Sequence, residues 1–210
     1  RLVSNENGRV LRPRAAALLE QALEAEGRFS EAHAAPLRLA SSYTIGEYLL
    51  PELIASWKTA HPGSHIRLDI ANTHDVFEAV SSFVADVGFI EGMHTHPELT
   101  VHKWLTDELV VVAAPAHPLA GARASAADLQ RAVWVVREPG SGTREASDRW
   151  LIPHLDELDV GLELGSNEAI KRAGAAGIGL GCLSRRAVLG AIAEGWLVEI
   201  ATGLPRMERT

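Results

Sequence analysis

The hydroxyl side chains of Ser41, Ser42 and Thr44 stand where a predicted strand gives way to a predicted helix. Residues 37–41 alternate as a strand does, and the residues that follow repeat apolar side chains at helical spacing. A helix N-terminus leaves backbone N–H groups without intrahelical partners and has the positive end of the helix dipole. These hydroxyls could therefore complete a site for a small anion. The alternative is that Thr44, with Glu47 three residues later, forms only a capping box for the helix.

A second polar segment, Gly-Ser-Gly-Thr-Arg at 140–144, follows the predicted strand at 133–137. Its glycines allow the backbone to come close to a ligand, and Arg144 offers a fixed cation to a carboxylate, sulfate or phosphate. The segment lacks the spacing of a nucleotide-binding P-loop. The alternative is an ordinary turn and helix cap, with Arg144 paired to Glu145 or Asp148 at the surface.

Small polar residues also follow two other predicted strands, at Asn72-Thr73 and at Ser166-Asn167. In open parallel sheets, ligands bind beyond the carboxyl ends of the strands. The sequence therefore predicts one site for a small anionic effector, lined from several strand ends. The side chains expected to line it are Ser41, Ser42, Thr44, Thr73, Ser141, Thr143, Arg144 and Asn167.

The composition is that of an ordinary globular protein. The 210 residues are 47% hydrophobic, which is enough to build the cores of two small lobes. No apolar run reaches the ~18 residues of a membrane span, and the first residues lack the apolar region of a signal peptide. The single cysteine, Cys182, excludes an internal disulfide and suits a reducing compartment. We therefore expect a cytoplasmic protein with no membrane partner.

The charge is unevenly distributed along the chain. Residues 1–14 contain four arginines and one glutamate, whereas the whole chain has a net charge of −7. The body is therefore strongly acidic and a poor partner for nucleic acid by itself. The basic start indicates either the edge of a DNA-contacting element or a solvated end.

Strands and helices are predicted to alternate through the body, which favours an α/β fold with mostly parallel sheets covered on both faces. Pro51 should bend the first long helix or end its first segment. The segment 113–129, which contains Pro115, Pro118 and Gly121, indicates the crossing between two lobes. The predicted strands are 37–41, 65–71, 86–90, 99–105, 108–114, 133–137, 160–164, 178–183 and 196–200, and the predicted helices are 44–59, 74–84, 143–151, 167–176 and 185–194.

A helix rich in alanine and leucine precedes the body. It is predicted to begin at Pro13 and to run to about Glu26, with Gly27 beyond its end. Its narrow apolar stripe favours pairing with another copy, although docking on its own body would use the same residues. Residues 28–36 are predicted to form a linker.

Enzymatic and metal sites are poorly supported. His94, His96 and His102 form the only histidine cluster, and no carboxylate or cysteine lies at a familiar ligand spacing from them. Ser141 lies in Gly-Ser-Gly, which is not the Gly-x-Ser-x-Gly of a nucleophile elbow. Cys182 lies in an apolar strand, where a buried and unreactive thiol is expected. We therefore expect no catalytic residue, no metal and no cofactor.

The order of these segments resembles the LysR-type transcriptional regulators, and the resemblance covers nearly the whole chain. The first residues resemble the end of a winged helix-turn-helix, and residues 37–210 resemble the effector-binding domain. The segments that support the resemblance are Arg1-Leu2-Val3 with Asn7-Gly8-Arg9-Val10-Leu11, Ser41-Ser42-Tyr43-Thr44-Ile45-Gly46-Glu47-Tyr48-Leu49-Leu50-Pro51, His61-Pro62-Gly63, Ala116-His117-Pro118-Leu119, Arg137-Glu138-Pro139-Gly140-Ser141-Gly142-Thr143-Arg144, and Ser166-Asn167 with Gly177-Ile178-Gly179-Leu180.

The resemblance implies two Rossmann-like lobes, joined by two crossover strands and preceded by a linker helix, with the effector between the lobes. It also implies homodimers or homotetramers, paired through the effector domains and the linker helix. DNA would be bound through a helix-turn-helix that is absent from these residues, and the chain would stop short of the family's final strand. The implied division is the end of a winged helix-turn-helix at 1–12, a linker helix and hinge at 13–36, lobe I at 37–113 plus 199–210, and lobe II at 114–198.

Matched by position, Ser42 and Thr44 correspond to the family's anion-contacting residues, and Thr73 corresponds to a polar contact on the second loop. The wall of the second lobe would consist of Ser141, Thr143 and Asn167.

We therefore expect the effector-sensing regulatory domain of a LysR-type transcription factor. It would bind a small anionic metabolite or an oxyanion and thereby control DNA binding. The main alternative is the solute-binding protein of a transporter, which would have the same lobes and would require export. An enzyme built on these lobes is a further alternative.

Overall fold

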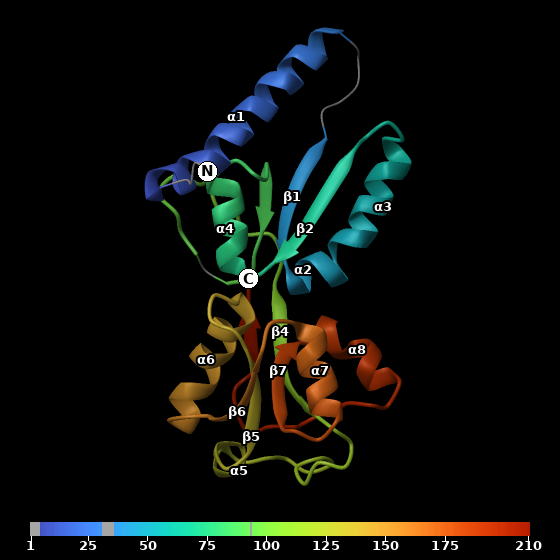
Figure 1. Ribbon diagram of the computed structural model, residues 1–210. Coiled ribbons are helices and arrows are strands. Elements are labelled where there is room, and N and C mark those ends of the chain that lie inside the picture. The colour runs from blue at the N-terminus through green and yellow to red at the C-terminus, as the bar shows by residue number, and fades with distance from the viewer. Residues whose placement is uncertain (1–4, 31–35, 93) are drawn as a thin grey trace. The chain divides into compact units, whose positions relative to one another are not determined.

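The computed structural model describes residues 5–30, 36–92 and 94–210, with side chains at 24–30 left aside (Figure 1). The chain forms two compact units, residues 1–90 and residues 91–210. Each unit has its own sheet with helices packed on it, which confirms the predicted α/β class with two lobes. Within the described part of the chain, no helix combines the length and the apolar character that a membrane-spanning segment requires.

The first unit contains a parallel sheet in the order β2-β1-β3. Its strands are β1 (Leu37–Ser42), β2 (Ile66–Ala71) and β3 (Val87–Phe89), and its helices are α1 (Glu6–Ser30), α2 (Tyr43–Tyr48), α3 (Leu50–Ala60) and α4 (Thr73–Ser81). In Figure 1, α3 and α4 flank the sheet on opposite sides. On the α4 side, a small core forms around Ala40, Val76 and Ala85.

The helix predicted at 44–59 is two helices. The first ends at Tyr48, and Pro51 occupies the first turn of the second, where a missing backbone N–H costs nothing. This confirms that Pro51 ends the first segment. The predicted capping box of Thr44 and Glu47 is wrong, because β1 continues to Ser42 and Ser42 is the N-cap of α2.

The second unit contains a mixed sheet in the order β6-β5-β7-β4-β8, with β9 also paired to β4. Strands β5, β6 and β7 are parallel to one another, and β4 is antiparallel to β7, β8 and β9. The elements are β4 (Asp107–Ala113), α5 (Ala126–Gln130), β5 (Val133–Arg137), α6 (Gly142–Leu155), β6 (Asp159–Leu164), α7 (Asn167–Ala175), β7 (Leu180–Ser184), α8 (Arg185–Ala193), β8 (Val198–Glu199) and β9 (Met207–Arg209).

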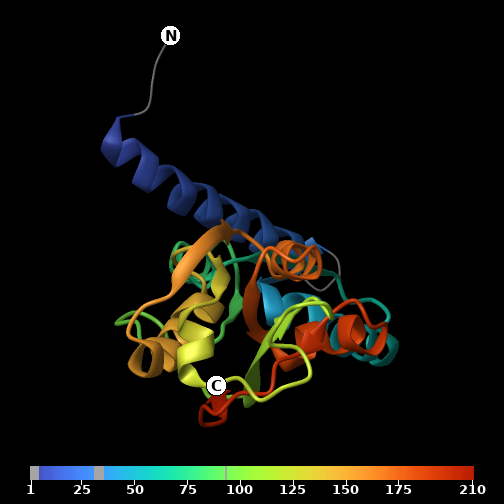
Figure 2. The same ribbon diagram turned by 90° about the horizontal axis from the view of Figure 1, so that it is seen from below.

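Apolar cores cover both faces of this second sheet. One core packs Trp134 of β5 and Leu109 of β4 against Leu151 of α6, and the other packs Val110 of β4 against α7 and α8. In Figure 2, α6 lies on one side of the sheet and α8 on the other. Burial on both faces explains why β4 contains the uninterrupted apolar run Leu109–Ala113.

Two expectations about these strands are corrected. The sequence analysis assigned residues 107–113 and 199–210 to the first lobe, but β4 and β9 are hydrogen-bonded in the second sheet. Residues 99–105 were expected to form a strand. Leu99 forms an isolated bridge with His96, but among the described residues no strand pairs with residues 100–105. Trp104 is half exposed.

Helix α1 is longer than predicted at both ends. Asn5 starts it by accepting a hydrogen bond from the Gly8 backbone N–H at 2.9 Å, so Pro13 lies inside the helix and does not begin it. The residues at 28–30 belong to the helix and not to a linker. Predictions for residues 1–4, and for residues 31–35 of the linker, lie outside the described residues.

Candidate effector site

The first group of predicted site residues lies at the carboxyl ends of β1 and β2. These strands are parallel, and Ser42 pairs in register with Ala71, so the turns that follow them are neighbours. Asn72 caps α4 by accepting a hydrogen bond from Asp75 N–H at 2.9 Å, which places Thr73 at the first position of that helix. The structure thus brings together four buried hydroxyl side chains, those of Ser41, Ser42, Thr44 and Thr73.

The hydroxyl of Ser42 is the most informative of these groups. Ser42 is 2% exposed, and within the described ranges its Oγ has no hydrogen-bond partner. Ser41 is satisfied locally, since its Oγ donates to the Ser42 carbonyl at 3.1 Å. A buried polar atom without a partner is uncommon in native proteins and needs an explanation, such as a bound ligand.

The second group lies at one edge of the second sheet. Strands β5 and β6 are parallel and end together at Arg137 and Leu164, and each is followed by the start of a helix. Ser141 caps α6 by accepting a hydrogen bond from Arg144 N–H at 3.3 Å, and Ser166 caps α7 by accepting one from Ala169 N–H at 3.1 Å. This edge brings together three buried predicted residues, Ser141, Thr143 and Asn167.

Two buried arginines contact these side chains, and the sequence analysis missed both. Arg137 is 3% exposed and donates to Asn167 Oδ1 at 2.8 Å. Arg209 is 6% exposed and donates to Thr143 Oγ1 at 3.0 Å. A charged residue directly after the apolar strand residues 133–136 was a signal for Arg137, whereas Arg209 reaches the site only because β9 pairs with β4.

The side chain of Arg144 is engaged elsewhere. It donates to Asp148 at 2.7 Å and to the Arg137 carbonyl at 2.8 Å, and it contacts Glu163 at 3.4 Å. The arrangement is close to the alternative in which Arg144 pairs with a neighbouring carboxylate. Glu145 instead lies 3.4 Å from His94.

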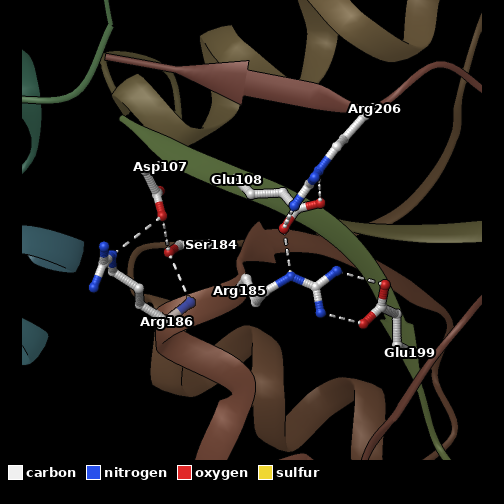
Figure 3. Close-up of polar contacts among 7 residues, drawn as sticks. All are labelled: Asp107, Glu108, Ser184, Arg185, Arg186, Glu199 and Arg206. Atoms are coloured by element: carbon white, nitrogen blue, oxygen red, sulfur yellow. Dashed lines mark hydrogen bonds and ion pairs between the residues drawn. The ribbon is translucent and has the colours of Figure 1, made fainter. Parts of the chain in front are cut away.

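Carboxylates balance the buried arginine Arg209. Asp107 begins β4 opposite Arg209 and lies 2.8 Å from the Nη2 of that arginine. Figure 3 shows that Asp107 also accepts a hydrogen bond from Ser184 Oγ, at 2.8 Å. Glu91 lies 3.7 Å from the same guanidinium. Asp107 therefore helps to hold Arg209 beside Thr143.

A neighbouring ion network joins several elements of the second unit (Figure 3). Glu108 of β4 accepts hydrogen bonds from Arg206 and Arg185, and Arg185 of α8 also contacts Glu199 of β8 at 2.7 Å. These two arginines lower the pKa of Glu108 to about 2. The network stabilises the attachment of α8, β8 and the segment before β9 to β4.

The site contains little that could perform covalent chemistry. Burial raises the pKa of the Cys182 thiol to about 12, so this group is not a nucleophile at neutral pH. Among the described residues, no group of three or more His, Cys, Asp or Glu side chains could hold a metal ion. His96 accepts a hydrogen bond from the Glu98 N–H at 3.2 Å, within its own loop.

Comparison with known proteins identifies the family. The model of the LysR substrate binding domain matches residues 30–210. An uncharacterized HTH-type transcriptional regulator of Escherichia coli (strain K12), YeiE, is 48% identical over 210 residues, which is 100% of this chain and 71% of that protein. The HTH-type transcriptional regulator CysL of Bacillus subtilis (strain 168) is 41% identical over 150 residues, which is 71% of this chain and 50% of that protein.

Solved structures agree with this result. The regulatory domain of CcmR from Synechocystis PCC6803, in complex with 2-PG, matches with a TM-score of 0.72 and 30% identity, over 83% of this chain and 85% of that chain. These relatives are regulators, which decides against the solute-binding protein of a transporter. A family model that spans the body of the chain, together with a relative similar along its whole length, shows that the chain belongs to the LysR-type transcriptional regulators, as their effector-sensing regulatory domain.

Proposed function

We propose that this domain binds a small anionic metabolite or an inorganic oxyanion at strand-end residues, of which the first unit offers Ser41, Ser42, Thr44 and Thr73. The observation that supports the proposal is the buried Ser42 hydroxyl, which has no partner among the described residues and lies beside three other buried hydroxyls. Hydroxyl and backbone donors at helix starts favour a negatively charged ligand. The complex of the CcmR regulatory domain with 2-PG supports a small effector for this chain.

Regulation follows if the effector binds one conformation of the regulator more tightly than another. The ligand then shifts the population of the two conformations by its difference in affinity. We propose that this shift reaches a DNA-binding domain through α1. We also propose that the regulator acts in the cytoplasm as a homodimer or homotetramer. In this proposal the domain neither catalyses a reaction nor needs a cofactor. The apolar side chains exposed on α1, Val10, Leu11, Leu18, Leu19 and Leu23, support pairing between copies.

Isothermal titration calorimetry of this chain with a panel of organic acids and oxyanions tests the proposal. Ser42→Ala and Thr44→Val should each weaken binding of the effective anion by at least about tenfold, because each removes a hydroxyl from the site. Thr59→Val is the matched control, since Thr59 is an exposed helical threonine that donates only to the Ala55 carbonyl. Unchanged affinity in both site variants would refute this location.

A further inference from the structure

We propose that Gly46 is a positioning residue of the effector site, because the absence of a side chain lets α2 pack directly on the ends of β1 and β2. This packing sets where the hydroxyls of Ser42 and Thr44 lie. The inference rests on the proposed function, since it concerns the same first-unit residues. Gly46 is buried inside α2 and has no side chain with which to contact a ligand itself.

Gly46 lies against two strand residues that are register partners. Ser41 of β1 pairs with Ile70 of β2 in the parallel sheet. A Cβ atom on Gly46 would lie 2.8 Å from Ile70 Cγ1, 3.0 Å from Ile70 Cδ1 and 3.3 Å from Ser41 Cβ. Non-bonded carbon atoms pack about 3.5–4.0 Å apart. The backbone of α2 therefore touches the sheet at this point and leaves no room for a methyl group.

The two neighbours of Gly46 differ in how easily they can move. Ser41 is fully buried, and its Cβ moves only with the backbone of β1. Ile70 is 38% exposed, so its side chain can turn, but a β-branched residue has few favourable rotamers. A side chain at position 46 would therefore lift α2 from the sheet or force Ile70 out of its place.

The position of α2 determines the position of the site hydroxyls. Ser42 is the N-cap of α2 and Thr44 is the second residue of the helix, so a shift of α2 moves both. Ser42 makes no capping hydrogen bond, and its Oγ has no partner within the described ranges. A side-chain cap therefore does not hold the start of α2. The contact at Gly46, about one turn further along, supplies a restraint in its place.

Hydrogen–deuterium exchange of this chain tests the packing without a ligand. Alanine forms helices more readily than glycine, so Gly46→Ala would slow the exchange of the α2 amides if helix propensity decided the result. We expect the opposite, exchange faster by about threefold or more, because the new Cβ separates α2 from the sheet. Gly63→Ala is the control, since open space surrounds its Cβ position, and it should leave α2 unchanged. Slower or unchanged exchange in Gly46→Ala would overturn the inference.

Ile70→Ala supplies a rescue for the same measurement. Truncation of Ile70 makes room for a methyl group at position 46, so adding Gly46→Ala to this variant should raise the exchange of α2 much less than it does in the wild type. The single Ile70→Ala variant accounts for any loss of protection that the truncation itself causes. If the increase is equal in the two backgrounds, Gly46 and Ile70 do not act on each other, and the inference is wrong.

Calorimetry with the panel of organic acids and oxyanions tests the role in binding. Gly46→Ala should weaken binding of the effective anion about fivefold, a loss typical of one hydrogen bond, and should weaken it less in the Ile70→Ala background. Gly63→Ala should bind as the wild type does. Unchanged affinity in Gly46→Ala, together with weaker binding in Ser42→Ala, would overturn the inference and leave the proposed function standing. No binding of any anion by the wild type would overturn both.

Discussion

At the residue scale, the sequence predicted the small polar residues of the proposed site but not the arginines that contact some of them. Ser42, Thr73 and Asn167 were predicted because, in parallel sheets, ligands bind beyond the carboxyl ends of the strands, where these residues stand. Arg137 and Arg209 were missed, because their role depends on contacts with residues 30 and 66 positions away in the chain. Local patterns predict the ends of elements, whereas tertiary contacts decide what an individual side chain faces.

Gly179 lies against the backbone of Val133, where β5 begins, and allows β5 and β7 to pack closely. A substitution at Gly179 tests this close packing. A Cβ on Gly179 would overlap the Val133 carbonyl oxygen, a backbone atom that cannot move aside cheaply. Gly179→Ala should therefore lower the free energy of unfolding by about 1–3 kcal/mol, measured by urea denaturation. Gly190→Ala in α8 is the control, because open space surrounds that position and the change should stabilise the helix by about 0.5–1 kcal/mol. Equal effects of the two substitutions would contradict this explanation.

At the element scale, helices and strands with a long amphipathic or apolar pattern were predicted well. Elements without such a pattern were not. The strand at 133–137 was located with its observed bounds, because its apolar run is bounded by turn residues. The short α5 and β9 were missed, since each has too few residues to show a periodic pattern. The predicted strand at 99–105 was wrong for the opposite reason, because alternation alone cannot supply a pairing partner.

Among the described residues, an ion pair between Glu20 and Arg38 joins helix α1 to β1 of the first unit. Arg38 of β1 lies 3.2 Å from Glu20 of α1 and also donates a hydrogen bond to Asp86 at 2.8 Å. The hydrogen bonds from Arg38 to Asp86 hold the pKa of Asp86 below its usual range. Ala17, one turn before Glu20, is 3% exposed, so this face of the helix is covered.

Glu20→Lys would place a second cation against the buried Arg38, and the repulsion should loosen α1. Hydrogen–deuterium exchange should show faster exchange of the amides around Ala17, while the amides of β1 keep their protection. Glu6→Lys, the same charge change at an exposed residue near the start of the helix, should leave the exchange around Ala17 nearly unchanged. Identical exchange in the two variants would mean that the ion pair does not hold the helix.

At the scale of the whole molecule, the resemblance to the family predicted the two-lobed α/β fold. Residue patterns did not predict which strands belong to which of the two sheets. The apolar strand at 107–113 suits either lobe by composition, and its place in the second sheet depends on its pairing with β7 and β9. That pairing is reinforced by ionic contacts between residues 77 and 98 positions apart, from Glu108 to Arg185 and to Arg206. Contacts at such separations are not visible as a pattern in one sequence.

This network makes the stability of the second unit depend on pH. The pKa of Glu108 is about 2 in the folded protein, below its ordinary value of 4.5, so the folded state favours the ionised carboxylate. Its contribution to stability is therefore fully present above about pH 4.5 and is lost as the pH falls toward 2. Glu108→Gln should destabilise the unit by about 1 kcal/mol at neutral pH and make its unfolding free energy less dependent on pH in that acidic range.

Tryptophan fluorescence during urea unfolding measures this effect in the appropriate unit, because four of the five tryptophans lie in residues 91–210. Glu52→Gln, at an exposed position of α3, is the matched control and should reproduce the wild-type dependence. If Glu108→Gln and the wild type lose stability in parallel between pH 4.5 and 2, protonation of Glu108 is not what weakens the sheet. The acid sensitivity would then have to come from other carboxylates of the unit, such as Asp107, whose contacts with Arg209 lie at the proposed effector site.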